Sequence, residues 1–343
     1  MSVHPDLAAP GTRLHVVSGK GGTGKTTVAA AMALALAREG QRVLLAEVEG
    51  RQGIAQVFDI PPLGLTEVRI LADVGGGQLW GLSVDAKAAL WEYLQTFYKL
   101  GRAGSALERL GAIDFATTIA PGVRDVLLIG KVYEAVGRTR GSKRGQGARV
   151  WDAVVLDAPP TGRIGRFLNV NAEVADVARV GPIRNQADSI TRLLRSGSTA
   201  VHLVTLLEEM PVQETVDAVG EISTLGMPLG SIIVNMVREA LLTEEELDTI
   251  ATAQRTPSAR DAVLSRITAD LRGAGIGVSA GLPRQLLSEA IDHAERLELE
   301  AEQETLLAAT GRPLRYLSYL PDGVEDGGLS TLAGQLSEPE QAP

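Results

Sequence analysis

The stretch from Gly19 to Thr27, which reads G-K-G-G-T-G-K-T-T, constrains the fold and chemistry of this chain more than any other. It matches G-x-x-x-x-G-K-[ST], a loop whose backbone N–H groups surround phosphates, with Lys25 reaching the terminal phosphates and the Thr26 hydroxyl able to hold Mg²⁺. A strand-favouring run, 14–17, precedes it, and a good helix former, 27–38, follows it. Because free amides and the helix dipole meet at a helix N-terminus, this order predicts a phosphate site. A glycine-rich turn without a ligand is the alternative.

A second lysine, Lys20, directly follows the first glycine of the loop. An ordinary phosphate-binding loop needs only Lys25. The extra lysine resembles the mark of the deviant P-loop ATPases, which include the arsenite-pump, MinD, ParA and nitrogenase iron-protein families. In those families this lysine reaches the nucleotide of the facing subunit, so the resemblance implies a dimer. A solvated lysine is the alternative.

The composition excludes several classes of protein. With 343 residues, 45% hydrophobic and 22% charged, the chain is long and apolar enough for a globular core. It has no cysteine, which excludes a disulfide framework, a cysteine zinc site, an iron–sulfur cluster and a thiolate metalloid site. A net charge of −9 argues against sequence-independent binding of nucleic acid. The absence of a leader and of a long apolar run predicts a cytoplasmic protein without an integral membrane segment.

Apolar strands alternate with helical patterns along the whole chain. Strand-like runs follow the first helix, at 42–46, 79–84, 152–157, 200–205, 231–235 and 314–320. Alternation of strand and helix favours a parallel sheet. The predicted class is therefore α/β, a doubly wound, mostly parallel sheet of the P-loop NTPase type. His15 and His202 lie inside apolar strands, and we expect both to be core histidines.

The sequence predicts one ATPase domain over residues 1–336. A helical subdomain is expected within it, from about 86–149 and 237–310, because the sequence is helical in character from 104 to 136 and nearly all helix-forming from 241 to 310. The segment 337–343 is acidic and contains proline, and it is expected to be a disordered tail.

Asp157 ends a continuous apolar strand and is followed by Ala158-Pro159-Pro160-Thr161-Gly162. A carboxylate in this place is typical of the second half of a nucleoside-triphosphate site, where it orients a water on Mg²⁺ and the loop senses the γ-phosphate. A structural aspartate that caps the turn is the alternative.

Several of these motifs together resemble one family, the arsenite-pump ATPase (ArsA) family, which includes the ATPases that target tail-anchored membrane proteins. The segment 157–163, D-A-P-P-T-G-R, is similar to its D-T-A-P-T-G-H signature. Glu208 followed by Glu214-Thr215 resembles its P-E-x-x-x-x-x-E-T stretch, and 81–85 and 121–125 resemble its E-I-D-P and P-G-I-D-E pieces. The matches extend from 18 to 235, and the cysteine-free chain looks most like the family's short actinobacterial members.

The resemblance implies a role for each matching residue. It assigns the phosphates to the loop, namely Gly21, Gly22, Thr23, Gly24 and Lys25, with Thr27 near the α-phosphate. It assigns Mg²⁺ to Thr26, with Asp157 acting through water. Asn235 stands at the family's adenine-reading asparagine, and the sequence has no N-K-x-D guanine motif after a strand, so ATP is favoured over GTP. The family's water-positioning aspartate aligns with Glu49.

The chain departs from the family pattern at three points. Glu49 adds one methylene to the expected aspartate, and a displacement of about 1 Å can cost around a hundredfold in rate. Arg163 replaces the signature histidine. The lack of cysteine removes both the metalloid site of the pump enzymes and the zinc site of the targeting enzymes.

The leading hypothesis is a dimeric ATPase that closes over Mg·ATP. Lys20, Lys25 and Glu49 are its expected catalytic residues, and its output is expected to be a conformational cycle that acts on a protein client through the helical segments. The partner could be an identical subunit or a paralogue. The alternatives are a catalytically weak, nucleotide-bound subunit of a heterodimer and a positioning ATPase of the MinD or ParA type.

Overall fold

The computed structural model describes most of the chain and divides it into two compact units. The first unit holds the sheet and is formed by residues up to 206, 210–237 and those from 307 on; the second is formed by 207–209 and 238–306. The residues that the structure describes are 11–48, 50–98, 121–140, 147–175, 182–279, 281–325 and 327–337. Residue 49 and most of the predicted tail therefore lie outside the described residues.

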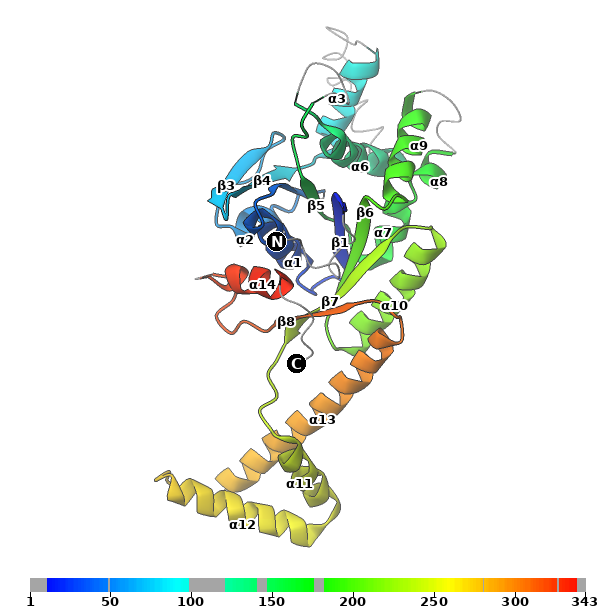
Figure 1. The fold of residues 1–343 in the computed structure, drawn as a ribbon. Helices are drawn as coiled ribbons and strands as arrows, with labels where there is room; N and C mark the ends of the chain where they lie inside the picture. The colour runs from blue at the N-terminus through cyan, green and yellow to red at the C-terminus, as the bar shows by residue number, and fades with distance from the viewer. Residues whose placement is uncertain are drawn as a thin grey trace. The chain divides into compact units, whose positions relative to one another are not determined.

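Within the described residues of the first unit, eight strands form one sheet in the order β3-β4-β2-β5-β1-β6-β7-β8 (Figure 1). The pairs are parallel except β3 with β4, which is antiparallel. The predicted class, a mostly parallel α/β sheet, is thereby confirmed. The strands are β1 (Leu14–Gly19), β2 (Arg42–Glu47), β3 (Val68–Val74), β4 (Gly77–Ser83), β5 (Ala153–Asp157), β6 (Thr199–Thr205), β7 (Leu229–Val237) and β8 (Leu314–Ser318).

The central strands are apolar along their whole length because helices cover both faces of a parallel sheet. All residues of β1 and β6 are buried. Val17 and Val155 belong to the core cluster that packs around α1 (Lys25–Arg38). Their neighbours Val16 and Leu156 are equally buried, and alternation along a strand directs them to the opposite face.

Helix α1 is buried around its full circumference, from Val28 to Ala37. It contacts the sheet through β1, β2 and β5, and α14 (Gly328–Ser337) packs against it (Figure 1). Alanine is the best helix former, and its small side chain lets neighbouring elements approach closely. An alanine-rich helix therefore suits this position, where α1 is enclosed between the sheet and α14.

The other helices of the first unit follow the strands in the chain. α6 contacts β5, α3, α8 and α9, and α7 contacts β1. Val126, Ile129 and Val132 recur at helical spacing on α6 and are buried. These helices are α2 (Gly53–Val57), α3 (Ala86–Tyr98), α6 (Pro121–Gly137), α7 (Thr161–Leu168), α8 (Val170–Ala175), α9 (Pro182–Leu194) and α10 (Glu209–Thr224).

Strand β3 is not among the strands that the sequence predicts. It forms an antiparallel edge with β4 across the turn at Gly75 and Gly76, both of which have positive φ. Its residues are exposed or half-buried, so the segment lacks the continuous apolar run of the buried strands. In the sequence, the two adjacent glycines between short strand-like runs were the feature that could have indicated this hairpin.

The second unit consists of helices in its described part, α11 (Glu244–Arg255), α12 (Pro257–Gly273) and α13 (Leu282–Ala308). A capping box begins α11, because the Thr243 side chain accepts from the Glu246 amide and the Glu246 side chain accepts in return. Gln254 of α11 donates to Glu295 of α13 at 3.0 Å. Helices α3 and α6 fall in the first unit, and the grouping of 86–149 with 237–310 as one subdomain stays a prediction.

His15 and His202 are core residues, as predicted, with 2% and 0% of their surfaces exposed. The Ser231 amide donates to His202 Nδ1 at 3.3 Å, so the proton of a neutral His202 ring lies on Nε2, which is 3.2 Å from His15 Nδ1. Burial lowers the pKa of His15 to about 4 and holds the pKa of His202 well below its usual value, with the nearby His15 adding to the effect. Both rings are therefore neutral at pH 7.

This buried pair predicts that acid destabilises the fold before carboxylates titrate. An exposed histidine has a pKa near 6.5, so the unfolded chain takes up protons that the folded chain refuses. The contribution of the two neutral rings to the free energy of unfolding is fully present above about pH 6.5. As the pH falls toward about 4, each ring lowers this free energy by on the order of 1 kcal/mol per pH unit. Urea unfolding followed by tryptophan fluorescence between pH 7.5 and 5 measures it. A His15→Leu/His202→Leu double variant should show a flatter dependence, and equal slopes would contradict the assignment.

Candidate nucleotide-binding site

The loop between β1 and α1 is shaped for an anion by its backbone. Gly24 occupies the N-cap position of α1 with φ of 83°, and among the described residues no side chain caps the helix. A Cβ at this position would overlap the side-chain amide of Asn235, so the loop requires glycine here for both conformation and space. The uncapped first amides of α1 are the donors that a phosphate group would use.

The carbonyl of Lys20 holds the interior of the loop together. It accepts from Lys25 Nζ at 3.1 Å and from the Thr23 hydroxyl at 2.9 Å. Asn235, near the end of β7, is buried and donates through Nδ2 to the Thr23 carbonyl at 2.9 Å. The Asn235 amide therefore supports the loop directly, and its predicted contact with adenine stays a prediction.

The expected phosphate-binding residues lie together in this loop. Gly21 and Gly22 are exposed, Gly24, Lys25 and Thr27 are half-buried, and Thr23 is buried. The two glycines leave the loop backbone open to solvent, where a ligand can approach it. Their contacts with nucleotide stay predictions.

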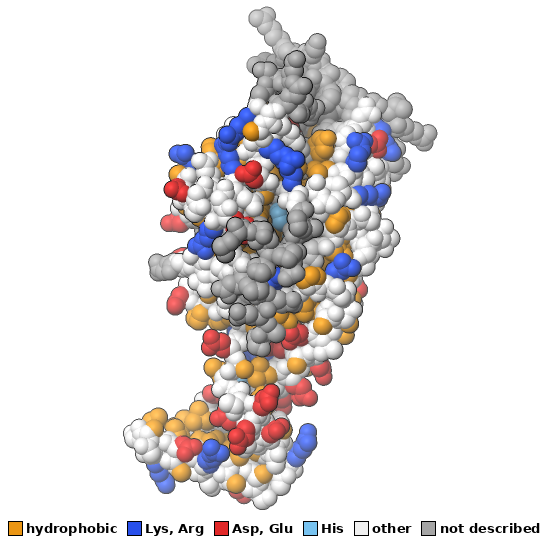
Figure 2. Space-filling view, in the orientation of Figure 1, with side chains coloured by type: hydrophobic (Ala, Val, Ile, Leu, Met, Phe, Trp, Pro, Cys, Tyr) orange, Lys and Arg blue, Asp and Glu red, His pale blue; other side chains and the backbone are white. Residues whose placement is uncertain are grey.

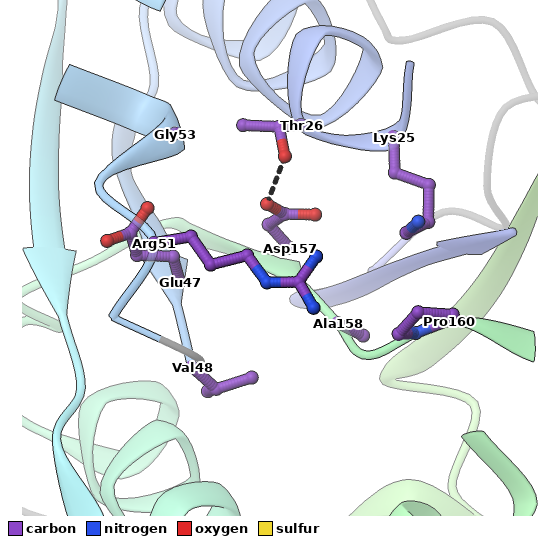
Figure 3. Close-up of a pocket in the computed structure, with 9 residues that line it drawn as sticks. All are labelled: Lys25, Thr26, Glu47, Val48, Arg51, Gly53, Asp157, Ala158 and Pro160. Atoms are coloured by element: carbon purple, nitrogen blue, oxygen red, sulfur yellow. Dashed lines mark hydrogen bonds between the residues drawn. The ribbon is translucent and has the colours of Figure 1, made fainter. Parts of the chain in front are cut away.

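Thr26 and Asp157 meet across the carboxyl ends of β1 and β5. The Thr26 hydroxyl donates to Asp157 Oδ2 at 2.6 Å, although the residues are 131 positions apart in the chain (Figure 3). Parallel register explains the contact, because Asp157 pairs with Val17 of β1 just before the loop begins. A hydroxyl and a carboxylate are hard oxygen donors that fit Mg²⁺, an ion that usually takes one or two protein ligands in addition to waters and substrate phosphates.

A pocket opens beside this pair, and it contains both predicted and unpredicted residues (Figure 3). Lys25 and Arg51 bring positive charge to it, and Glu47 and Asp157 bring negative charge. Arg51 was missed by the sequence analysis, although it closely follows the acidic end of a strand. The lining residues are Lys25, Thr26, Glu47, Val48, Arg51, Gly53, Asp157, Ala158 and Pro160.

Glu47 has a structural role in this pocket. It is 3% exposed, and its carboxylate accepts from the amides of Gln52 and Ile54 at 3.0 and 3.2 Å. The Ser83 hydroxyl of β4 donates to it at 2.9 Å. These donors satisfy the carboxylate, which thereby anchors the turn between β2 and α2. Glu49, the expected water-positioning residue, lies outside the described residues.

One carboxylate joins Lys20 to the segment that follows Asp157. Glu214 of α10 lies 3.1 Å from Lys20 Nζ, and its other oxygen accepts from the Thr161 hydroxyl, at the start of α7, at 2.8 Å. Burial opposes ionisation of Glu214, but the hydrogen bonds from Thr161 and Lys20 and the charges of Lys20 and Lys25 outweigh it and lower its pKa. In the sequence, Glu214 stands out only as part of a family-like stretch, and its contact with Lys20 and Thr161 was not predicted.

Comparison with known proteins agrees with the geometry. Residues 12–196 match the family described as anion-transporting ATPase. The chain is 48% identical to ATPase BagA of Mycobacterium tuberculosis strain H37Rv, over 96% of this chain and 93% of that protein. It is 26% identical to ATPase GET3 of Kluyveromyces lactis, over 69% of this chain and 76% of that protein. In the part of the chain that the structure describes, every helix is too short or too polar to cross a membrane. The chain therefore belongs to the anion-transporting ATPase (ArsA) family and is an ATP hydrolase.

Proposed function

We propose that this ATPase closes as a dimer over Mg·ATP and uses hydrolysis to drive a conformational cycle of its helical segments. The observation that carries the proposal is the contact of Glu214 with both Lys20 and Thr161. Lys20 corresponds to the lysine that, in the deviant P-loop families, reaches the facing subunit's nucleotide. Thr161 begins the helix that follows the γ-phosphate-sensing segment, so one carboxylate touches both of the parts that would respond to ATP.

The strength of this contact suits a reversible step. The side chains of Lys20 and Glu214 are 27% and 35% exposed. Ion pairs this accessible to water contribute about 0–1 kcal/mol, so an incoming triphosphate can displace the carboxylate from the lysine. Release of Lys20 would leave Glu214 with Thr161 alone, and the event at the phosphates would thus reach α7 and α10.

The proposed chemistry assigns one task to each residue. Lys25, Lys20 and the loop amides stabilise charge that develops on the transferring phosphoryl group. Thr26 and Asp157 would hold Mg²⁺, whose charge neutralises the phosphates when it is bound. Glu49 is proposed from the sequence alone to hold the attacking water, and Asn235 to favour ATP over GTP.

The proposed output is movement of helices that a protein client contacts. The second unit exposes several large apolar side chains, which supports a client surface: Leu241 is 79% exposed, Leu299 58%, Leu306 51% and Ile276 50%. Figure 2 shows hydrophobic side chains at the surface of this unit, among acidic and basic ones. Some relatives are named as arsenical pump-driving ATPases. Because this chain has no cysteine, we do not propose a metalloid as its substrate. A cytoplasmic location is part of the same proposal.

A second candidate is a catalytically weak subunit that works with a paralogous partner. Glu49 favours it, because glutamate places the carboxylate one methylene farther than the aspartate of the family pattern. Phosphate release measured with and without a paralogue distinguishes the two candidates.

Lys25→Ala should lower phosphate release by at least about 100-fold, since a preorganised cation is lost from the transition state.

Lys20→Ala should retain nucleotide binding but lose both turnover and ATP-dependent dimerisation. Phosphate release and light scattering with and without Mg·ATP measure these effects. Native turnover and an ATP-dependent dimer in Lys20→Ala would refute the role proposed for the second lysine.

Glu214→Gln should lower the ATP concentration required for half-maximal dimer formation by about 2- to 5-fold, because Lys20 no longer has to leave an ion pair. Glu209→Gln, an exposed position on the same helix, gives the same change of net charge and is the control. Light scattering during an ATP titration measures the midpoint. An equal shift in both variants would show that only net charge matters.

Glu49→Asp tests the second candidate. If the extra methylene slows hydrolysis, the aspartate should raise kcat of the isolated chain by about 10-fold or more. A lower kcat in the variant would show that the native turn is built for glutamate, and the weak-subunit candidate would lose its support.

A further inference from the structure

Arg51 is a second cation in the pocket that Lys25 lines, and the chemistry proposed for Lys20, Lys25 and Glu49 does not use it. It is exposed and lies in the turn between β2 and α2, with Lys25 on the P-loop side of the same pocket. Figure 3 shows its side chain extending across the pocket, past Asp157 and toward Ala158 and Pro160. The guanidinium thus lies on the side where the segment after β5 would meet the last phosphate of a bound nucleotide.

The backbone on the C-terminal side of Arg51 is held by several contacts. The amides of Gln52 and Ile54 donate to the buried carboxylate of Glu47. The Gln52 side chain accepts from the Leu63 amide at 2.7 Å and donates to the Leu63 carbonyl at 3.1 Å. Gln52 has a φ of 57°, a conformation that these contacts maintain in a residue other than glycine. The backbone next to Arg51 is therefore held in place by these contacts.

The same turn lies directly against the start of α1. A Cβ on Gly53 would come 2.9 Å from Thr26 Cγ2, which leaves no room for a side chain between the turn and the P-loop helix. Arg51, two residues earlier, is consequently held within the reach of its own side chain from Thr26 and Asp157, the pair proposed to hold Mg²⁺.

When a triphosphate enters the pocket, a further cation is needed to balance its negative charge. Glu47 is occupied by its own turn, whereas Asp157 adds negative charge next to the phosphates. Lys25 is a point charge, but an arginine has a planar set of donors that can bind two phosphate oxygens at once. A guanidinium group also keeps its positive charge throughout a reaction.

We propose that Arg51 is a catalytic residue that contacts the γ-phosphoryl oxygens and stabilises the transition state of hydrolysis from within the same subunit. Water oxygen bonds to the γ-phosphorus, the bond from that phosphorus to the β–γ bridging oxygen breaks, and the electron pair stays on ADP. Of the two protons of the water, one stays on the phosphate product and the other passes to solvent, and Arg51 exchanges no proton. The proposal rests on the ATP hydrolysis assigned to the family.

Arg51→Gln and Arg51→Lys test this role against ATP, ADP and ADP with aluminium fluoride, a mimic of the transferring phosphoryl group. A cation that acts on the transferring phosphoryl group contributes about 10³-fold or more in other nucleotide hydrolases. We expect Arg51→Gln to lower kcat by at least about 100-fold and to abolish trapping of ADP with aluminium fluoride, while its Kd for ADP changes less than about 3-fold. Arg51→Lys should recover part of the rate.

Arg69→Gln is the matched control, since Arg69 is exposed on the edge strand β3 and its loss changes the net charge equally. Native kcat and native trapping in Arg51→Gln would overturn the proposal, as would equal losses of ATP and ADP affinity at unchanged kcat. If the native chain alone binds nucleotide without turnover, the dimer cycle proposed for an isolated chain fails. Arg51 would then still be supported by a loss of ATP-over-ADP preference in Arg51→Gln, and refuted if that preference were retained.

Discussion

The parallel pairing of β1 with β5 on one side and β6 on the other is the constraint on which the site depends. Parallel strands end at the same edge of a sheet, so the loop after β1 and the carboxylate at the end of β5 must meet there. The 2.6 Å contact of Thr26 with Asp157 is the direct result. The neighbouring strand β2 adds the turn that carries Arg51, because it pairs with β5 in the same direction.

The fold was largely predictable because its buried strands are continuous apolar runs. Strands β1, β2, β5 and β6 have almost no polar residues that face water, and the buried part of the helix after the first loop, 28–37, is entirely apolar. Strand β3 was missed since an exposed edge strand is stabilised by pairing with one neighbour, a tertiary interaction that its own sequence hardly records. The histidine pair was recognisable as core, but the contact between the two rings was not.

The site was predictable only where it is contiguous in the chain or marked by a strand end. Gly24, Lys25 and Thr26 are parts of one motif, and Asp157 terminates an apolar strand. Arg51 and Glu214 differ from them, because each is one polar residue among many in a sequence where 22% of residues are charged. Their significance comes from distances across the fold, such as 3.1 Å from Glu214 to Lys20, which spacing along the chain does not encode.

Helix α1 is enclosed between the sheet and α14, with buried side chains on every side from Val28 to Ala37. A close-packed helix cannot tilt or slide without opening voids or clashes along its whole length. The loop between β1 and α1 is therefore attached to a helix that resists displacement. This loop is the rigid side of the site, and the movement proposed for the ATPase cycle falls to the start of α7, where Thr161 donates to Glu214.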